Sequence, residues 1–317
     1  MADKPSRALV LYGDGLARFI DPSHTHLHSL SSKASCGFLS LPNAPASESE
    51  DERIVREFAI LLDACEAYLN LNGVVGKDEC QQKNLIPTIS ERFMGMKSAV
   101  ITSNSSLKSF GTKLGFSMLE FNEFSKNNHL QAEPTENSFV ASKLLELLGF
   151  EEGKTLDMSE FDLVFVHIGA GENDKATAND LEFVNSLVGG IMHVAQPGSE
   201  IGSRLHFSVM LGYGSVSEDD DSSKLSFSIL KDEKNSELSE LFPRQSYTMK
   251  GENQRKDVRH HSPMLIAQLQ YAVTRKDMVE TFSFKDFNEN GGNLVIPADR
   301  FLHEVAFKLW KAPKYGA

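Results

Sequence analysis

Residues 161–174, FDLVFVHIGAGEND, constrain the fold more than any other stretch of this sequence. The run is apolar up to residue 166 except for Asp162, and His167, small residues and acidic residues follow. A short continuous apolar run rich in Val and Phe that ends at Gly and acidic residues predicts a buried parallel strand whose carboxyl end opens into a loop. In open α/β sheets, ligands bind at that end of the strands.

A second strand is predicted at residues 8–12, ALVLY, followed by Gly13-Asp14-Gly15. This turn places an acidic residue at the carboxyl end of the strand. Because the carboxyl ends of parallel strands meet at one edge of a sheet, we expect Asp14 to lie in the same layer as His167. Asp14 is thus expected at the end of the sheet where ligands bind, although an Asp here can also simply support the Gly-Asp-Gly turn.

Length, charge and cysteine content exclude several classes of protein. The chain has 317 residues, enough for one large α/β domain or a core with an inserted unit, and its net charge of −12 with scattered Lys and Arg argues against nucleic-acid binding. Its three cysteines lack C-x-x-C spacing, which argues against a disulfide framework or a cysteine zinc site. The apolar stretch near the N-terminus is too short for a signal or a membrane span. We expect a cytoplasmic protein with no membrane association, and a nuclear share is also compatible.

Hydrophobic periodicity and turn signals predict the remaining elements. Helices are expected at residues 54–71, 106–114, 139–148, 181–194, 264–273 and 298–310, and strands at residues 98–103, 116–121, 205–211 and 225–230. The β-α-β pattern within 98–121 favours an inserted unit with its own sheet. We therefore expect a core formed by residues 1–75 and 136–317, and an inserted α/β cap domain at residues 76–135.

Two further stretches contain residue types that bind metals or react. His24, His26 and His28 alternate, which would suit three ligands on one strand face, but PSHTHLHSL is more typical of a polar loop that enters a helix. Residues 45–52, PASESEDE, precede a helical pattern. Serine followed by acidic residues is first of all typical of a helix N-terminus, where the serine caps and the acids complement the helix dipole.

Several motifs together resemble cofactor-independent phosphoglycerate mutase of the archaeal type, a member of the alkaline phosphatase superfamily. They are LVLYGDGLA, PAS at residues 45–47, MKSAVITSNSSLKSFGTKLGFSMLEF, SFVASKLLELLGF with FDLVFVHIGA, and the C-terminal FKDF and GGNLVIPADRFLHE. The resemblance is collinear over most of the chain. It implies an α/β fold with an alkaline-phosphatase-like, mostly parallel sheet sandwiched by helices.

The resemblance also implies a site. In the family, Asp and His side chains at the strand ends hold two divalent ions, and a metal-activated Ser or Thr accepts the phosphoryl group. Carried over, Asp14 is the first metal ligand, Ser47 the candidate nucleophile and His167 a candidate catalytic residue or ligand. Further candidate metal ligands are Glu172, Asp174, His260 and His261.

The match is incomplete at the residues that matter most. Glu48 stands where the family has Asp, and Ala176 stands near the place of a ligating His. Gly212 and Tyr213 replace an Asp-His ligand pair after the strand at 205–211. The remaining ligands are too few for two closed metal ions.

Two hypotheses follow, and we favour the first. A pseudoenzyme, without a cofactor, would use the fold to bind a protein partner or a small phosphorylated ligand. Alternatively, a metal-dependent phosphatase or phosphomutase would use Ser47 as nucleophile with a single Mn, Zn or Mg ion. A nucleotide site in the β-α-β unit is weaker, because TSNSSLKSFG lacks the glycine fingerprint.

Overall fold

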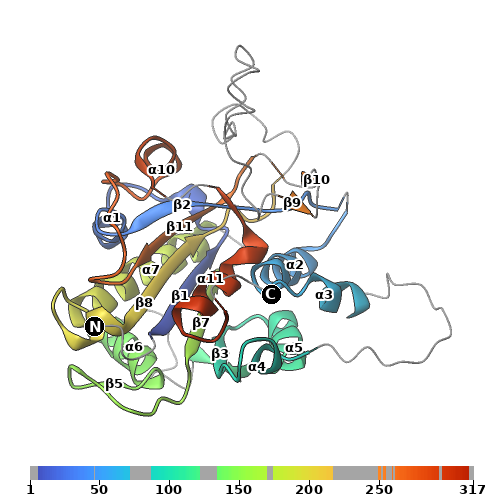
Figure 1. Cartoon of the computed structure of the whole chain (residues 1–317). Helices are drawn as coiled ribbons and strands as arrows, with labels where there is room; N and C mark the ends of the chain where they lie inside the picture. Colours follow the sequence, from blue (N-terminus) through green and yellow to red (C-terminus); the bar gives the residue numbers. More distant parts are fainter. Residues whose placement is uncertain are drawn as a thin grey trace.

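A computed structural model describes residues 6–45, 47–71, 87–121, 134–169, 174–216, 249–250, 253–254, 259, 261–292 and 295–313. An eight-stranded sheet forms the centre of the molecule (Figure 1). Strand β1 (Arg7–Asp14) lies between β7 (Leu163–Gly169) and β8 (Leu205–Leu211) and runs parallel to both. The two strands that the sequence most strongly predicts are therefore neighbours.

The order of the strands is β12-β2-β11-β8-β1-β7-β3-β4. Within this sheet β11 (Met264–Leu269) is antiparallel to both of its neighbours, and the other pairs are parallel. The remaining strands are β2 (Ser35–Ser40), β3 (Ser98–Ile101), β4 (Ser117–Leu119) and β12 (Ile296–Pro297). The predicted α/β class with a mostly parallel sheet is confirmed.

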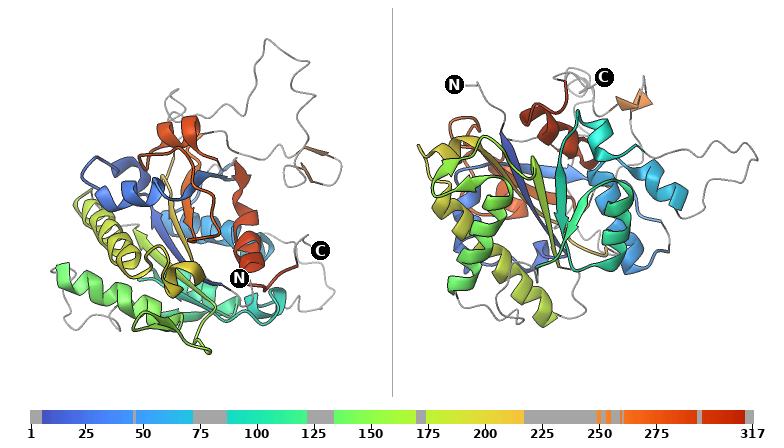
Figure 2. Two further views of the ribbon diagram at one scale, coloured as in Figure 1. Left: turned by 60° about the vertical axis from the view of Figure 1, so that its left-hand side comes forward. Right: turned by 90° about the horizontal axis from the view of Figure 1, so that it is seen from below.

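Alternation along β1 divides the buried apolar residues into two cores. Leu9 and Leu11 belong to one core, and Ala8, Val10 and Tyr12 belong to the other. Successive side chains of a strand point to opposite faces, so each face needs its own layer of helices. The first face is covered by α1 (Thr25–Ser31), α6 (Pro134–Leu147) and α7 (Asp174–Val194), and the second by α2 (Glu50–Leu61), α5 (Ser105–Lys113) and α11 (Phe301–Lys308). The right-hand view of Figure 2 shows the sheet between these two layers.

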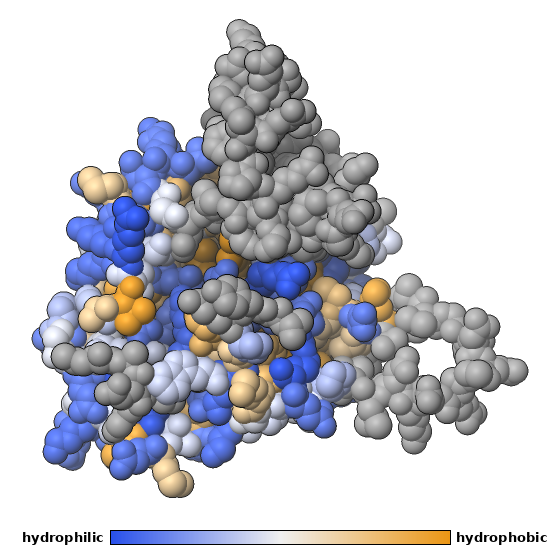
Figure 3. Space-filling model, in the orientation of Figure 1, coloured by the Kyte–Doolittle hydropathy of each residue, from blue (hydrophilic) through white to orange (hydrophobic). Residues whose placement is uncertain are grey.

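Shorter elements complete the described chain. They are the 3-10 helices η1 (Ala17–Phe19) and η5 (Ala298–Arg300), the helices α3 (Cys65–Leu71), α4 (Ile89–Arg92), α8 (Glu200–Arg204) and α10 (Phe284–Asn290), and the two-residue strands β5 (Phe150–Glu151), β6 (Lys154–Thr155), β9 (Met249–Lys250) and β10 (Asn253–Gln254). Hydrophilic residues dominate the coloured surface in the orientation of Figure 3, with hydrophobic residues scattered among them. Among the described helices, none is both long and apolar enough to cross a membrane.

Two predicted elements differ from the structure. The helix expected at residues 264–273 is wrong, because residues 264–269 form β11 and are buried on both faces. A short apolar run buried on both sides has no periodicity that separates strand from helix. The helix expected at residues 54–71 is divided into α2 and α3, and Asp63 between them adopts a φ of 50°.

The β-α-β unit at residues 98–121 is present, but its strands join the main sheet. Strand β3 pairs with β7, with Ala99 opposite Val164, and β4 extends the same sheet as its edge strand. The prediction that this unit has a sheet of its own is therefore wrong for the described strands. The division into a core and a cap domain at residues 76–135 stays a prediction. The strand expected at residues 225–230 lies outside the described residues.

The alternating histidines lie at the start of α1 and not on a strand. His24 is the N-cap residue of this helix, and His28 lies within it. Phe282 donates its backbone N–H to His28 Nδ1 at 3.0 Å. The interpretation of PSHTHLHSL as a polar loop that enters a helix is confirmed.

Candidate functional site

Asp14 and His167 lie together at the carboxyl ends of adjacent strands. In the parallel pairing of β1 with β7, Tyr12 is opposite His167 and Asp14 is opposite Gly169. His167 Nε2 is 3.7 Å from Asp14 Oδ2, and both side chains are buried. The structure thus brings these two predicted residues into one layer.

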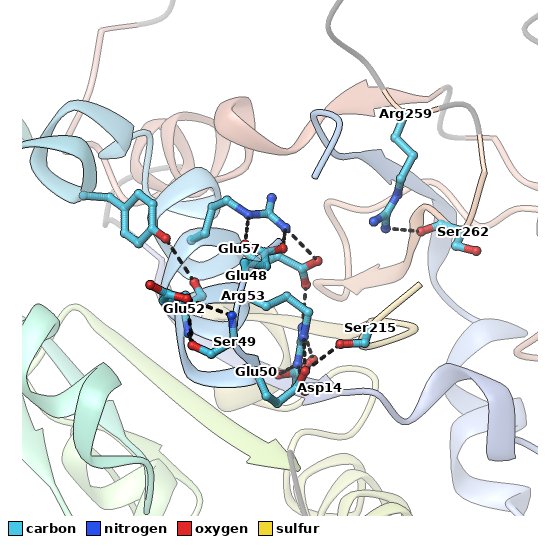
Figure 4. Close-up of polar contacts among 12 residues, drawn as sticks. Asp14, Glu48, Ser49, Glu50, Glu52, Arg53, Glu57, Ser215, Arg259 and Ser262 are labelled. Carbon is cyan, nitrogen blue, oxygen red and sulfur yellow. Dashed lines mark hydrogen bonds and ion pairs between the residues drawn. The ribbon is translucent and has the colours of Figure 1, made fainter. Parts of the chain in front are cut away.

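A third residue, Arg53, comes to the same place from helix α2. The helix begins after Ser49, which forms a capping box with Glu52, and Arg53 follows one turn later. Its Nη1 donates to Asp14 Oδ1 at 3.0 Å and its Nη2 to Asp14 Oδ2 at 2.8 Å (Figure 4). The planar fork of a guanidinium matches both oxygens of a carboxylate, so this is a bidentate pair.

The same guanidinium binds two more carboxylates on its own helix. Arg53 Nε and Nη2 donate to Glu50 at 3.0 and 2.5 Å, and Nη1 donates to Glu57 Oε2 at 3.1 Å. Spacings of three and four residues place Glu50, Arg53 and Glu57 on one face of a helix. All five N–H donors that an arginine possesses are used here.

Tyr12 completes the cluster from β1. Its hydroxyl donates to Glu57 Oε2 at 3.2 Å and lies 3.4 Å from Asp14 Oδ1. Burial, with Asp14 and Glu57 nearby, holds the pKa of Tyr12 well above its usual value. The phenol therefore remains a proton donor to Glu57.

Burial and neighbouring charges shift the pKa values of the two buried acids, Asp14 and Glu57. Burial raises the pKa of Asp14, but His167 and the Arg53 guanidinium outweigh burial and lower this pKa to about 2. The lowering thus has two sources, the His167 imidazole, whose Nε2 is 3.7 Å from Asp14 Oδ2, and the bidentate Arg53 guanidinium. Burial raises the pKa of Glu57 although Arg53 opposes it.

His167 is fixed by a hydroxyl on its other side. Its Nδ1 is 3.0 Å from Thr102 Oγ1, which also accepts the backbone N–H of Asn104 at 3.1 Å. A hydroxyl oxygen has two acceptor lone pairs and one proton, so Thr102 serves either tautomer of His167, as donor to Nδ1 or as acceptor from Nδ1–H. Among the described residues, the buried Nε2 has no hydrogen-bond partner.

Ser47 is exposed and lies before α2, and the residue that caps this helix is Ser49. Ser49 Oγ accepts the backbone N–H of Glu52 at 3.3 Å. Glu48, where the resemblance expects Asp, receives two hydrogen bonds from Arg56, at 2.8 and 2.7 Å. The role of Ser47 as a nucleophile stays a prediction.

The other predicted ligands are only partly described. Glu172 and His260 lie outside the described residues, and Asp174 begins α7 with its side chain outside the described part. His261 is half-buried just before β11, and its carbonyl oxygen accepts from Arg259 Nε at 3.1 Å. Their role as metal ligands also stays a prediction.

Gly212, which follows β8, faces the cluster without a side chain. A Cβ atom at this position would lie 3.4 Å from the Tyr12 hydroxyl and 3.9 Å from Asp14 Oδ1. The backbone of Gly212 is held by Gly13, whose carbonyl accepts its N–H at 2.9 Å. The place from which the resemblance expects a ligand is therefore adjacent to Asp14 and carries no donor atom.

The sequence does not single out Arg53, Glu50, Glu57 or Tyr12. Charged residues in a helix usually mark a solvated face, and Tyr12 belongs to an apolar strand. The available signal is that Arg53 and Glu57 alternate with Ile54 and Phe58 in a helix that is buried almost all round. Charges in such a helix must find partners in the interior.

The donor set does not fit the pair of metal ions that the resemblance implies. Both oxygens of Asp14 are bound by Arg53, and a guanidinium has no lone pair for a metal. In the described ranges, no three His, Cys, Asp or Glu side chains are arranged to hold a metal ion.

No family model and no curated protein matches the sequence. Solved structures are similar: the PH0037 protein from Pyrococcus horikoshii is 11% identical, covers 99% of both chains and has a TM-score of 0.55. Cofactor-independent phosphoglycerate mutase from Thermoplasma acidophilum is 10% identical over 96% of this chain and 100% of its own, with a TM-score of 0.44. A Vibrio parahaemolyticus protein of the alkaline phosphatase superfamily is 9% identical over 99% of this chain and 69% of its own, with a TM-score of 0.47.

The fold of this chain is similar to that of the PH0037 protein. At an identity of 11%, this similarity concerns the fold and not an activity. The chemistry must be argued from the residues at the strand ends.

Proposed function

We propose that this chain is a non-catalytic member of the alkaline phosphatase superfamily that acts as a binding or scaffold protein. The observation that carries the proposal is the bidentate contact between Arg53 and Asp14. Both oxygens of the carboxylate that would hold the first metal ion accept hydrogen bonds from a side chain of the same chain.

The chemistry of phosphoryl transfer explains why this contact matters. A serine hydroxyl is a poor nucleophile until a base or a metal activates it, and the charge that develops on the transferring group needs cations. Arg53 is a cation, but its five donors are already committed to Asp14, Glu50 and Glu57. It has no donor left for a phosphoryl oxygen.

The same cluster favours a protein over a phosphorylated molecule as the partner. At the end of β1 three carboxylates bind the Arg53 guanidinium, so this cation offers no donor to a phosphate. A fold of this size offers a large surface, and in this proposal its surface, rather than the strand ends, is what the partner contacts.

Turnover assays test the catalytic half of the proposal. The wild-type protein is incubated with an aryl phosphate and with phosphoglycerates in the presence of Mn²⁺, Zn²⁺ or Mg²⁺. We expect no phosphate release above the buffer control. Release that is abolished in both Ser47→Ala and Asp14→Ala would overturn the proposal and establish the metal-dependent phosphatase or phosphomutase instead.

Thermal stability in the presence of ligand tests the choice of partner. We expect 3-phosphoglycerate and inorganic phosphate to leave the melting temperature unchanged, because a ligand stabilises only the state to which it binds. A concentration-dependent rise that disappears in Asp14→Ala would show that a phosphorylated ligand binds at the strand ends.

A further inference from the structure

Three polar side chains lie in a row on an otherwise apolar face of the sheet. Gln268 of β11 donates through Nε2 to Ser208 Oγ at 3.4 Å, and Ser208 Oγ is 3.2 Å from His206 Nε2 on β8. All three side chains are buried. In the pairing of β8 with β1, His206 is opposite Ala8, and paired residues share a face of the sheet. His206 therefore points into the second core, the one that α2, α5 and α11 cover.

The end of α11 lies near His206. Ala8 pairs with His206 on one side and with Leu163 on the other, so these three residues form one row across the sheet. Asp162, the residue before this row in β7, binds Lys311 Nζ at 3.2 Å. Lys311 follows α11 by three residues. This ion pair holds the end of α11 at the row that contains His206.

The surroundings of His206 suit a neutral imidazole and not a charged one. A neutral ring carries one N–H group, whereas a charged ring carries two and needs two acceptors. Ser208 can serve Nε2 in either state, because a hydroxyl both donates and accepts. Nδ1 is buried and, within the described part of the chain, has no hydrogen-bond partner. A protonated ring would therefore bury a charge with one donor unpaired, which costs free energy.

The charged groups around His206 also disfavour its protonation. Strand β11 is uncharged, and Arg7 of β1 is on the opposite face, where it donates to the carbonyl oxygens of residues 148, 149 and 156. On α11, Lys308 in the last turn has the same sign as a protonated His206, and Glu304 one turn earlier offsets part of that charge. Burial and Lys308 hold the pKa of His206 well below its usual value of 6.5.

We propose that His206 is a pH switch for α11: the neutral imidazole allows the helix to pack on the sheet, and protonation at mildly acidic pH favours a state in which the helix is released. The helix has eight residues, and a helix of this length is stable only while it is packed. Its release is therefore a local opening that hydrates the ring. The inference goes beyond the proposed function and does not rest on it.

The sign and size of the effect follow from the two protonation states. The released state takes up the proton with an ordinary pKa near 6.5, and the packed state does not, so the packed state is favoured fully above that pH and less as the pH falls below it. Between pH 7.5 and pH 5.0 the equilibrium should shift about thirtyfold toward the released state.

The test is hydrogen exchange of backbone amides at pH 7.5 and pH 5.0, corrected for the intrinsic exchange rate. We expect the protection of α11 to fall about thirtyfold at the lower pH, while α7 on the other face of the sheet keeps its protection. In His206→Gln and in His206→Leu the fall should disappear, because no titrating group remains. The matched control is His193→Gln, which removes an exposed histidine of α7 and should behave as the wild type.

The opposite results would overturn the proposal. A fall in α11 protection that persists in both His206 variants would exclude His206 as the switch. Equal losses in α7 and α11 would show that the proton is taken up on global unfolding. If neither variant folds, the wild type still decides, because the His206 ring signal in NMR spectra should not titrate between pH 7.5 and pH 5.5, and a midpoint near the ordinary value would contradict the proposal. Phosphate release in the turnover assays would remove only the proposed function.

Discussion

At the scale of single residues, the cluster at the end of β1 is a closed set of charges. Arg53 is 3% exposed and uses all of its donors, and its partners Asp14 and Glu57 are 1% and 2% exposed. Taking such charges out of water is costly, and removing one partner typically costs about 3–5 kcal/mol because the remaining charge is buried alone. Asp14, Arg53 and Glu57 should therefore tolerate little change, whereas Glu50, whose side chain is 49% exposed, should tolerate more.

Tyr12→Phe tests the contribution of the phenol. The variant removes the only side-chain hydroxyl that the cluster receives from β1 within the described residues and leaves Glu57 with one donor fewer. We expect a loss of about 1.5–3 kcal/mol in the free energy of unfolding, as for hydrogen bonds to charged groups, measured by urea denaturation. Tyr68→Phe is the control, since its exposed hydroxyl contact should contribute less than about 0.5 kcal/mol. Equal losses in the two variants would contradict the buried contact.

The pKa of Asp14 predicts a change in acid stability. Its folded value of about 2 lies below the usual 3.8, so its ionised form stabilises the fold above about pH 4. This stabilisation is lost as the pH falls from about 4 to about 2, and its size is about 2 kcal/mol. Asp14→Asn should therefore be less stable than wild type at pH 7 and lose less stability across that window. Parallel pH profiles for the two proteins would exclude the assignment.

The sequence can place a residue at the end of a strand only where it predicts the strand itself. Asp14 and His167 follow apolar runs, and the topology of parallel sheets brings such residues together. Arg53 has no comparable signal, because its role depends on how α2 packs against β1, and linear spacing does not contain that distance.

At the scale of elements, α2 positions the cluster through its first turn. Ser49 and Glu52 satisfy each other's backbone N–H groups, and the helix starts so that Arg53 faces Asp14. A shift of this start by one residue would rotate Arg53 by about 100° around the helix axis. The cap therefore fixes the position of the charge as well as the stability of the helix.

Ser49→Ala tests the cap against a neighbouring serine. We expect it to lower the free energy of unfolding by about 1 kcal/mol, the usual cost of losing an N-cap. Ser47→Ala serves as the matched control and should change stability by less than about 0.5 kcal/mol, because Ser47 is exposed and precedes the helix. A larger loss in Ser47→Ala than in Ser49→Ala would contradict the assigned helix start.

The sequence predicts those helices and strands whose apolar residues repeat with a single clear period. The strand β8 has the predicted bounds, residues 205–211, and α5 is within a residue of its expected ends at residues 106–114. Strand β11 is mistaken for a helix because its apolar run is buried on both faces. Strand β2 is not predicted, since its serines and Gly37 resemble a loop until β11 pairs with it.

At the scale of the whole molecule, the fold does not determine the chemistry of the side chains at the strand ends. The order of strands places β1 near the centre of the sheet, with β7 and β8 at its sides. The same order brings Gly212 to the cluster from β8 and His167 from β7. The topology thus gathers Asp14, His167 and Gly212 at one end of the sheet, and the Arg53 guanidinium binds both oxygens of Asp14 there.

The most direct measurement of this account is a calorimetric titration of Mn²⁺ and Zn²⁺ into chelator-treated wild-type protein, with Asp14→Ala beside it. We expect no binding at micromolar concentrations by the wild type, because Arg53 occupies both oxygens of Asp14, and none by Asp14→Ala, which lacks this carboxylate. Stoichiometric binding by the wild type that is micromolar or tighter, and that vanishes in Asp14→Ala, would show that the carboxylate holds a metal ion and would contradict the central claim.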